Sequence, residues 1–131
     1  MTKTILFMCP HNAAKSVLAA AIAQRLLDER GLHDFVVYSA GTHPDPQIAP
    51  AVASYLKENG YPVGTPVPRK FTGEDVQNAH TIVSLGCDLN LLKNAAPKIL
   101  DWSDVPPPSA DLPAAVHAIG DKVEALISQL T

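Results

Sequence analysis

Hydrophobic residues along this chain alternate between short unbroken runs and longer segments with three- and four-residue spacing. Short continuous runs are typical of parallel strands that are covered on both faces. They predict strands over residues 4–8, 35–39, 81–85 and 98–100. The longer periodic segments, together with Thr72 as a candidate N-cap, predict helices over residues 16–30, 48–59, 72–77 and 89–94 and from Pro113 to the C-terminus.

The repeated order of strand and helix predicts an α/β fold. We expect a three-layer sandwich, with a four-stranded parallel sheet between helices on both faces and right-handed crossovers. Ligands of such sheets bind beyond the carboxyl ends of the strands. That edge would collect Cys9, residues 39–42, Cys87 and residues 101–104.

Composition narrows the class of protein. The 131 residues are 47% hydrophobic but only 5% aromatic, which predicts one domain over residues 1–131 with an aliphatic core. The net charge of −3 and the lack of a long basic cluster argue against binding to nucleic acid or to an anionic membrane. The apolar run 4–9 is too short for a signal peptide, and two cysteines suit reduced thiols, so we expect a cytoplasmic protein.

Candidate chemistry begins where the first strand ends. Cys9 follows the strand, a short polar turn comes next, and a helix opens at Lys15 and Ser16. Successive N–H groups at a helix start, with the positive end of its dipole, form a cradle for a tetrahedral oxyanion. The same field favours a thiolate, which predicts Cys9 as a nucleophile, Lys15 as the cation and Ser16 as a hydroxyl donor. The anion-binding turn would comprise Pro10, His11, Asn12, Ala13, Ala14, Lys15 and Ser16. The alternative is that Cys9 is simply a small buried hydrophobic residue.

The spacing Cys9-x5-Lys15-Ser16 resembles the Cys-x5-Arg-Ser/Thr loop of the low-molecular-weight protein tyrosine phosphatases. The arsenate reductases coupled to thioredoxin or mycothiol share that fold and loop. Residues 11–16 are most similar to the arsenate-reductase-like branch. Further similarity over residues 39–42, 48–60 and 79–87 extends the resemblance to nearly the whole chain. It implies that the Asn12 amide braces the loop from inside.

Two positions depart from the family pattern. The family's loop arginine grips two oxygens through a planar fork, whereas Lys15 offers one compact charge. The resemblance places the general acid of the phosphatases at Pro107, so that Asp104 or Asp101 would have to replace it. General acid catalysis contributes about 10²- to 10⁴-fold. We therefore expect phosphotyrosine hydrolysis to be weakened.

Two further side chains have open roles. Some arsenate reductases of this fold resolve the oxidised nucleophile with a cysteine after the third strand, and Cys87 stands there. Cys87 is either a resolving thiol or a plain strand-end thiol. If it is a plain thiol, thioredoxin or a low-molecular-weight thiol completes the cycle.

His11 in the turn also has two possible roles. It either donates to the anion, which would make anion affinity sensitive to pH, or is an exposed loop residue without a role.

Three hypotheses remain. The preferred one is an enzyme in which Cys9 attacks phosphate, arsenate or a phosphorylated substrate, with arsenate reduction suiting the two departures better. The second is a catalytically weak or inactive phosphate-binding module. The third is a redox or partner-binding domain that uses Cys9 and Cys87. The other histidines lack metal-ligand spacing, so no metal and no cofactor are expected.

Overall fold

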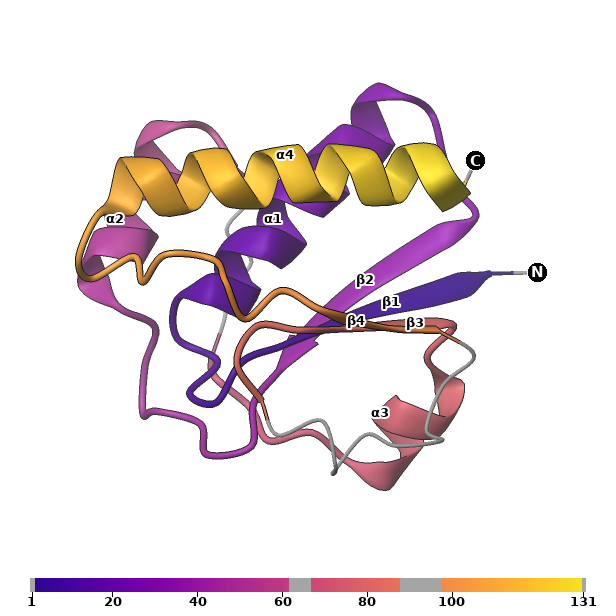
Figure 1. Cartoon of the computed structure of the whole chain (residues 1–131), viewed down its shortest axis with the longest axis horizontal. Coiled ribbons are helices and arrows are strands. Elements are labelled where there is room, and N and C mark those ends of the chain that lie inside the picture. The colour runs from indigo at the N-terminus through magenta and orange to yellow at the C-terminus, as the bar shows by residue number, and fades with distance from the viewer. Residues whose placement is uncertain (1, 62–66, 88–97, 131) are drawn as a thin grey trace.

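The structure is a computed structural model that describes residues 2–61, 67–87 and 98–130. Strands and helices alternate along much of the chain (Figure 1). In chain order they are β1 (Lys3–Met8), α1 (Lys15–Glu29), β2 (Phe35–Ala40), α2 (Pro50–Glu58), α3 (Gly73–Asn78), β3 (Thr81–Ser84), β4 (Lys98–Asp101) and α4 (Leu112–Leu130).

The four strands form one parallel sheet in the order β2-β1-β3-β4. β1 lies inside the sheet, paired with β2 on one side and β3 on the other. Its residues Ile5 to Met8 are at most 1% exposed, as its unbroken apolar run requires. The predicted four-stranded parallel sheet is confirmed.

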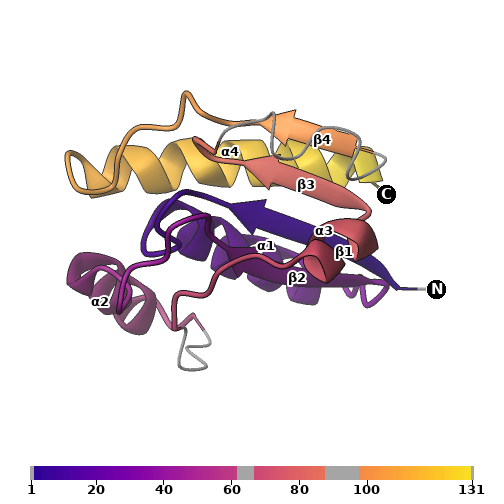
Figure 2. The same ribbon diagram turned by 90° about the horizontal axis from the view of Figure 1, so that it is seen from below.

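Helices cover both faces of the sheet, as predicted. α1, α2 and α4 lie on one face, whereas the short helix α3 lies on the other (Figures 1 and 2). Side chains of β1 alternate between the two layers: Ile5 and Phe7 belong to the larger core cluster, and Leu6 and Met8 pack in a smaller one with Val76 of α3. The carboxyl end of β1 is thus packed against side chains on both faces of the sheet.

Element boundaries differ from the sequence prediction by only a few residues. α2 begins at Pro50 rather than at residue 48, because proline suits the first helical position, where no N–H donor is needed. Thr72 caps α3 as predicted, in a capping box with Asp75. The helix predicted at residues 89–94 falls outside the described residues. Within the described ranges, no helix is long and apolar enough to cross a membrane.

Candidate functional site

Cys9 lies directly after the central strand β1 and immediately before the turn that leads into α1. Only 5% of this residue is exposed. Its Sγ lies 3.0 Å from the Oγ of Ser16 and accepts a hydrogen bond of 3.4 Å from the Ser16 N–H in the first turn of α1. Hydrogen bonds to sulfur stabilise the thiolate more than the thiol. The start of α1 therefore contributes two hydrogen-bonding groups, the Ser16 hydroxyl and N–H, to the Cys9 sulfur.

Asn12 fixes the direction of the Ser16 hydroxyl. Its Nδ2 donates to Ser16 Oγ at 2.8 Å, which occupies one acceptor site of the hydroxyl and leaves its hydrogen available to the Cys9 sulfur 3.0 Å away. Asn12 is 2% exposed and has a φ of 47°, in the left-handed region that asparagine tolerates better than most residues. Its Oδ1 accepts from the main-chain N–H of Arg69 at 2.9 Å. The turn is thereby anchored to a distant segment.

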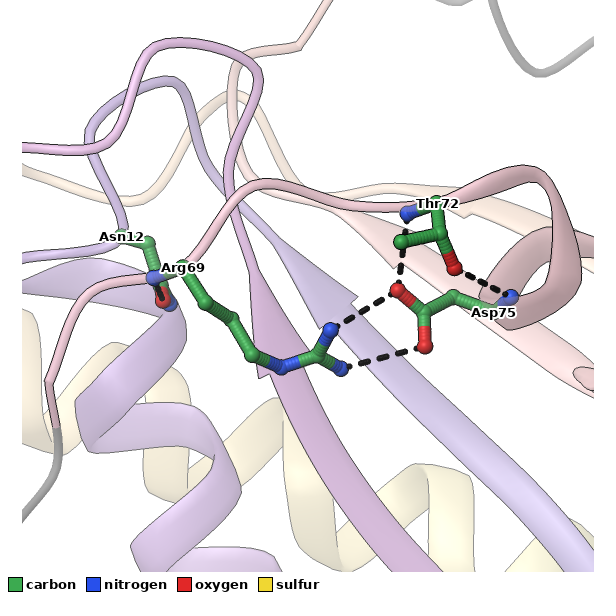
Figure 3. A network of polar contacts seen from close by, with 4 residues as sticks. All are labelled: Asn12, Arg69, Thr72 and Asp75. Atoms are coloured by element: carbon green, nitrogen blue, oxygen red, sulfur yellow. Dashed lines mark hydrogen bonds and ion pairs between the residues drawn. The ribbon is translucent and has the colours of Figure 1, made fainter.

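Arg69 extends this anchor to helix α3 (Figure 3). Its guanidinium makes two hydrogen bonds to the carboxylate of Asp75, at 2.8 and 3.3 Å, and that carboxylate also accepts from the N–H of Thr72. Burial alone would raise the pKa of Asp75, but the hydrogen bonds from Arg69 and Thr72 outweigh it and hold the pKa below its ordinary value. The ionised carboxylate thus stabilises the segment that holds Asn12.

Gly41 allows β2 and the Cys9 turn to approach closely. A Cβ at this position would lie 2.8 Å from the carbonyl oxygens of both Cys9 and Pro10. Beyond Gly41, the N–H groups of His43, Asp45 and Ala49 donate to carbonyls of residues 10, 11 and 13 at 2.7 to 3.0 Å. In the part of the chain that the structure describes, no acceptor takes the N–H groups of residues 11–14. The turn therefore has its carbonyls bound and its N–H donors free, which is the arrangement an anion needs.

A cavity of about 400 Å³ opens over the turn. Its lining comes from four parts of the chain and consists of Cys9, Pro10, His11, Ala13, Ala14, Lys15, Asp45, Ala49, Leu85, Gly86, Pro107, Pro108 and Ser109. The predicted turn residues thus divide into two groups. Most of them line the cavity with Cys9, whereas Asn12 and Ser16 are buried and hold the turn from below.

The segment after β4 contributes prolines to the cavity and no carboxylate. Pro107, the position at which we expected the family's acid, is among the lining residues, but Asp104 is not. The Asp104 carboxylate lies 3.2 Å from the Nζ of Lys122, and its side chain is 73% exposed. The role of Asp104 as a general acid stays a prediction, and this position gives it no support.

Cys87 lies close to the cavity but outside its lining. Its N–H donates to Ser84 Oγ at 3.0 Å, and the Ser84 hydroxyl donates back to the Cys87 carbonyl at 3.2 Å. Burial, and to a smaller extent the charge of the nearby Cys9 sulfur, raise the pKa of Cys87 to about 11. A pKa of about 11 favours the protonated thiol of Cys87 at neutral pH, and the two cysteine sulfurs are close enough to interact electrostatically.

Two side chains near the turn escaped the sequence analysis. Asp45 lines the cavity, and its Oδ1 lies 3.2 Å from the Nδ1 of His11. Arg69 supports Asn12 from a proline-rich loop. The only sequence signal for Asp45 is its place in the polar turn after the second strand, at the edge where ligands bind. Across residues 2–61, 67–87 and 98–130, no group of three or more histidine, cysteine or carboxylate side chains is arranged to hold a metal.

Comparisons with known proteins agree with this geometry. Residues 4–131 match the profile of the family described as low molecular weight phosphotyrosine protein phosphatase. A protein of Halobacterium salinarum named "Putative arsenate reductase" is 26% identical over 125 residues, which are 95% of this chain and 87% of that protein.

Solved structures share the fold. YfkJ from Bacillus subtilis gives a TM-score of 0.86 at 20% identity, and the match covers 99% of this chain and 95% of that chain. The thioredoxin-dependent arsenate reductase Cg_ArsC1' of Corynebacterium glutamicum gives 0.79 at 22% identity, with 98% of this chain and 61% of that chain covered. At these identities the likeness establishes the four-stranded parallel architecture.

Proposed function

This chain belongs to the low molecular weight phosphotyrosine protein phosphatase family, and we propose that within it the protein is a Cys9-dependent arsenate reductase. One observation carries the proposal: Cys9 lines a cavity to which the segment after β4 contributes Pro107, Pro108 and Ser109 and no carboxylate. The relative named as an arsenate reductase, over 95% of this chain, supports the same branch.

The leaving group decides between the two reactions. Hydrolysis of a phosphate ester expels an alkoxide or phenoxide, which needs a proton from an acid within hydrogen-bonding reach. Arsenate loses only an oxygen that leaves as hydroxide or water, so it depends less on a carboxylic acid. The described lining also offers no aromatic side chain against which a phosphotyrosine ring could pack. A small inorganic anion suits this cavity better.

Binding of the anion would use the turn and Lys15. The free N–H groups of residues 11–14 point donors at the oxyanion, and the Lys15 ammonium supplies one compact positive charge. Because lysine lacks the bidentate fork of arginine, we expect the anion to be held with less directional control.

In the first chemical step, the Cys9 thiolate attacks arsenic and forms an S–As bond while an As–O bond breaks. The departing oxygen takes a proton and leaves as water. In the second step, a thiolate attacks Cys9 Sγ, an S–S bond forms, and the S–As pair of electrons reduces arsenic(V) to arsenic(III), which leaves as arsenite. The product is one disulfide for each arsenite.

The second thiol is better supplied from outside the chain. With a pKa of about 11, only about one Cys87 in 10⁴ is a thiolate at pH 7, which makes it a slow attacking group. Thioredoxin or a low-molecular-weight thiol would reach Cys9 through the open cavity. The existence of a thioredoxin-dependent arsenate reductase with this fold agrees with such a partner.

Lys15 also favours a second candidate. A loop that keeps its cation and N–H donors, but has neither the arginine fork nor a carboxylic acid from the segment after β4, could bind phosphate without turning it over. This reading predicts tight phosphate binding, protection of Cys9 from alkylation by phosphate, and no product.

The test compares the wild type with Cys9→Ser and Cys87→Ser. Arsenate-dependent consumption of thiols is followed with thioredoxin or a small thiol, and p-nitrophenyl phosphate hydrolysis is measured in parallel. We expect arsenate-dependent turnover that is lost in Cys9→Ser and kept in Cys87→Ser. Loss in Cys87→Ser would make Cys87 the resolving thiol. No turnover with either substrate, together with phosphate protection of Cys9, would establish the binding module.

A further inference from the structure

We infer that Asp45 and His11 form a proton-donating pair at the mouth of the cavity, in which Asp45 is a positioning residue and His11 donates to the bound oxyanion. The transfer of that proton to a leaving oxygen rests on the proposed function. The contact between His11 and the anion does not, because it concerns binding alone.

The contacts of the His11 ring fix where its hydrogen lies. Nδ1 is 3.2 Å from the Oδ1 of Asp45 and 3.3 Å from the carbonyl oxygen of His43. The hydrogen bond is the one to the His43 carbonyl, which can only accept, so Nδ1 is the donor in it, whereas the Asp45 carboxylate makes an ion-pair contact. No described group contacts Nε2. A second proton on the ring therefore resides on Nε2, the atom that is free to meet a ligand.

Asp45 holds His11 in two ways. Its N–H donates to the His11 carbonyl at 3.0 Å, while its carboxylate faces the His11 ring. The N–H of His43 makes the next bond along, to the carbonyl of Pro10 at 2.7 Å. The segment that carries the carboxylate is thus tied to the turn that carries the imidazole, and both residues belong to the cavity lining.

Both members of the pair line the cavity that contains Cys9. The titratable groups that share this lining are Cys9, Lys15 and Asp45, and the described residues from the segments 85–86 and 107–109 add none. The imidazole of His43 contacts the Thr42 hydroxyl instead. Among the side chains of the described lining, His11 is the only imidazole, the side-chain type used most often for proton transfer, and its Nε2 makes no hydrogen bond.

The pair cannot be explained as a stabilising ion pair. The side chains of His11 and Asp45 are 65% and 48% exposed, and exposed pairs of this kind add little to stability. Their value lies in orientation: the His43 carbonyl accepts from Nδ1, the nearby carboxylate favours a positive charge on the ring, and Nε2 is left for the ligand.

The proton balance of the arsenate step is complete with this donor. The Cys9 thiolate, hydrogen arsenate dianion and the imidazolium of His11 together carry two negative charges. They become a thiol-bound arsenate dianion, one water and a neutral imidazole, which carry the same total. The proton on Nε2 goes to the departing oxygen, and solvent restores it afterwards. The exposed His11 ring can exchange protons with bulk water directly.

Sulfate binding tests the contact without any turnover. Sulfate stays a dianion between pH 5.5 and 8.5, and the Cys9→Ser background removes the thiolate that would otherwise repel it. We expect the affinity of Cys9→Ser for sulfate to fall on the order of tenfold across this range, the effect of one charge-assisted hydrogen bond. When His11→Gln is added to Cys9→Ser, the affinity for sulfate should no longer depend on pH. When His43→Gln is added instead, the affinity should still decrease with rising pH as in Cys9→Ser. When Asp45→Asn is added, the decrease in affinity should occur at lower pH.

Arsenate turnover tests the transfer itself. In the otherwise native chain, we expect His11→Gln to lower kcat for arsenate about 10²-fold with a smaller change in KM. We also expect the kcat of the wild type to decrease with rising pH, and Asp45→Asn to shift this decrease to lower pH. Thermal midpoints close to that of the wild type separate this effect from misfolding.

The outcomes are distinct. A pH-independent affinity in Cys9→Ser, or a pH-dependent one that survives His11→Gln, overturns the inference. Wild-type turnover that His11→Gln leaves intact overturns the proton transfer alone. Absence of turnover in the wild type contradicts the proposed function, and the sulfate measurement still decides whether His11 and Asp45 act on the anion.

Discussion

The two sides of the Cys9 turn are built in opposite ways. The inner side, formed by Asn12, Ser16 and their partners Gly41 and Arg69, is buried or part-buried, and its polar atoms are paired at 2.8 to 3.4 Å. The outer rim, formed by His11, Asp45 and the segment 107–109, is more open to solvent, and its charged groups face the cavity.

This difference suggests that the inner side determines the structure of the turn, whereas the rim determines the chemistry of the site. The inner side sets the path of the turn, so a change there removes the site together with part of the stability. The proposals above assign proton donation to the rim, so we expect a change there to alter the reaction and leave the fold intact. Pro107 belongs to this rim. The predictions below test that division.

Substitution of Gly41 should have the largest effect. In Gly41→Ala the new Cβ would lie 2.8 Å from two main-chain oxygens and 3.0 Å from the Cβ of Asn12, so the turn must move. We expect a loss of about 3 kcal/mol in the free energy of unfolding and loss of anion binding. Chemical denaturation and phosphate protection of Cys9 measure the two effects.

Gly120→Ala is the matched control for Gly41→Ala. Gly120 lies inside α4, and a Cβ there would meet no atom within 4 Å. Because alanine favours the helix, this variant should gain about 0.5–1 kcal/mol and bind anions normally. Equal anion binding by the two glycine variants would contradict the role assigned to the inner side.

Asn12 combines an unusual backbone with two hydrogen bonds, and two variants separate them. Asn12→Ala should lose about 1–3 kcal/mol of stability from the unpaired Ser16 and Arg69 groups, and roughly 1 kcal/mol more because alanine resists a φ of 47°. Asn12→Gly accepts that φ and should lose the hydrogen-bond part alone. Thermal and denaturant unfolding of both variants gives the difference, and equal losses would mean that the backbone is unstrained.

Asp75 should make a smaller, pH-dependent contribution. Its pKa is held below the ordinary 3.8, so the carboxylate stabilises the fold fully above about pH 4, and this contribution is lost as the pH falls through the lowered pKa. At neutral pH, Asp75→Asn should be less stable by under about 1 kcal/mol, because the pair with Arg69 is partly exposed. The difference in free energy of unfolding between the wild type and Asp75→Asn, measured by urea titration, should shrink as the pH is lowered towards 2. A constant difference would exclude the titration of Asp75 as its cause.

Asp104→Asn should have the smallest effect. The carboxylate contacts Lys122 and lies outside the cavity lining, so stability should change by less than about 0.5 kcal/mol and arsenate turnover should be unchanged. Asp121→Asn, on the exposed surface of α4, serves as the control. A 10²- to 10⁴-fold loss of turnover in Asp104→Asn alone would instead make Asp104 the general acid, reached by movement of its loop.

Most of the fold could be predicted from the sequence because local patterns determine it. The apolar run that became β1 is buried on both faces, and the alternation of strands and helices leaves few arrangements other than a parallel sheet with covered faces. The boundaries were less certain where two signals compete, as at Pro50, which begins α2 two residues later than the periodicity suggests.

The site was predictable only where its residues are close in sequence. Cys9, Lys15 and Ser16 share one turn, so spacing alone indicates their proximity. Arg69 and Asp45 reach that turn from loops, through contacts that no periodicity encodes. Asp104 illustrates the reverse case, since its nearness in sequence to the expected acid did not bring its carboxylate into the cavity.

The cavity lining also has a consequence for the order in which the protein is made. Cys9 is synthesised before Ser109, the last residue of the wall opposite it, with about 100 residues between them. At about 5–20 residues per second, the Cys9 thiol of a nascent chain spends roughly 5–20 s without its finished enclosure. During that interval it is open to any oxidant or alkylating agent, so a cysteine whose enclosure is synthesised much later depends on its surroundings before it depends on its own fold.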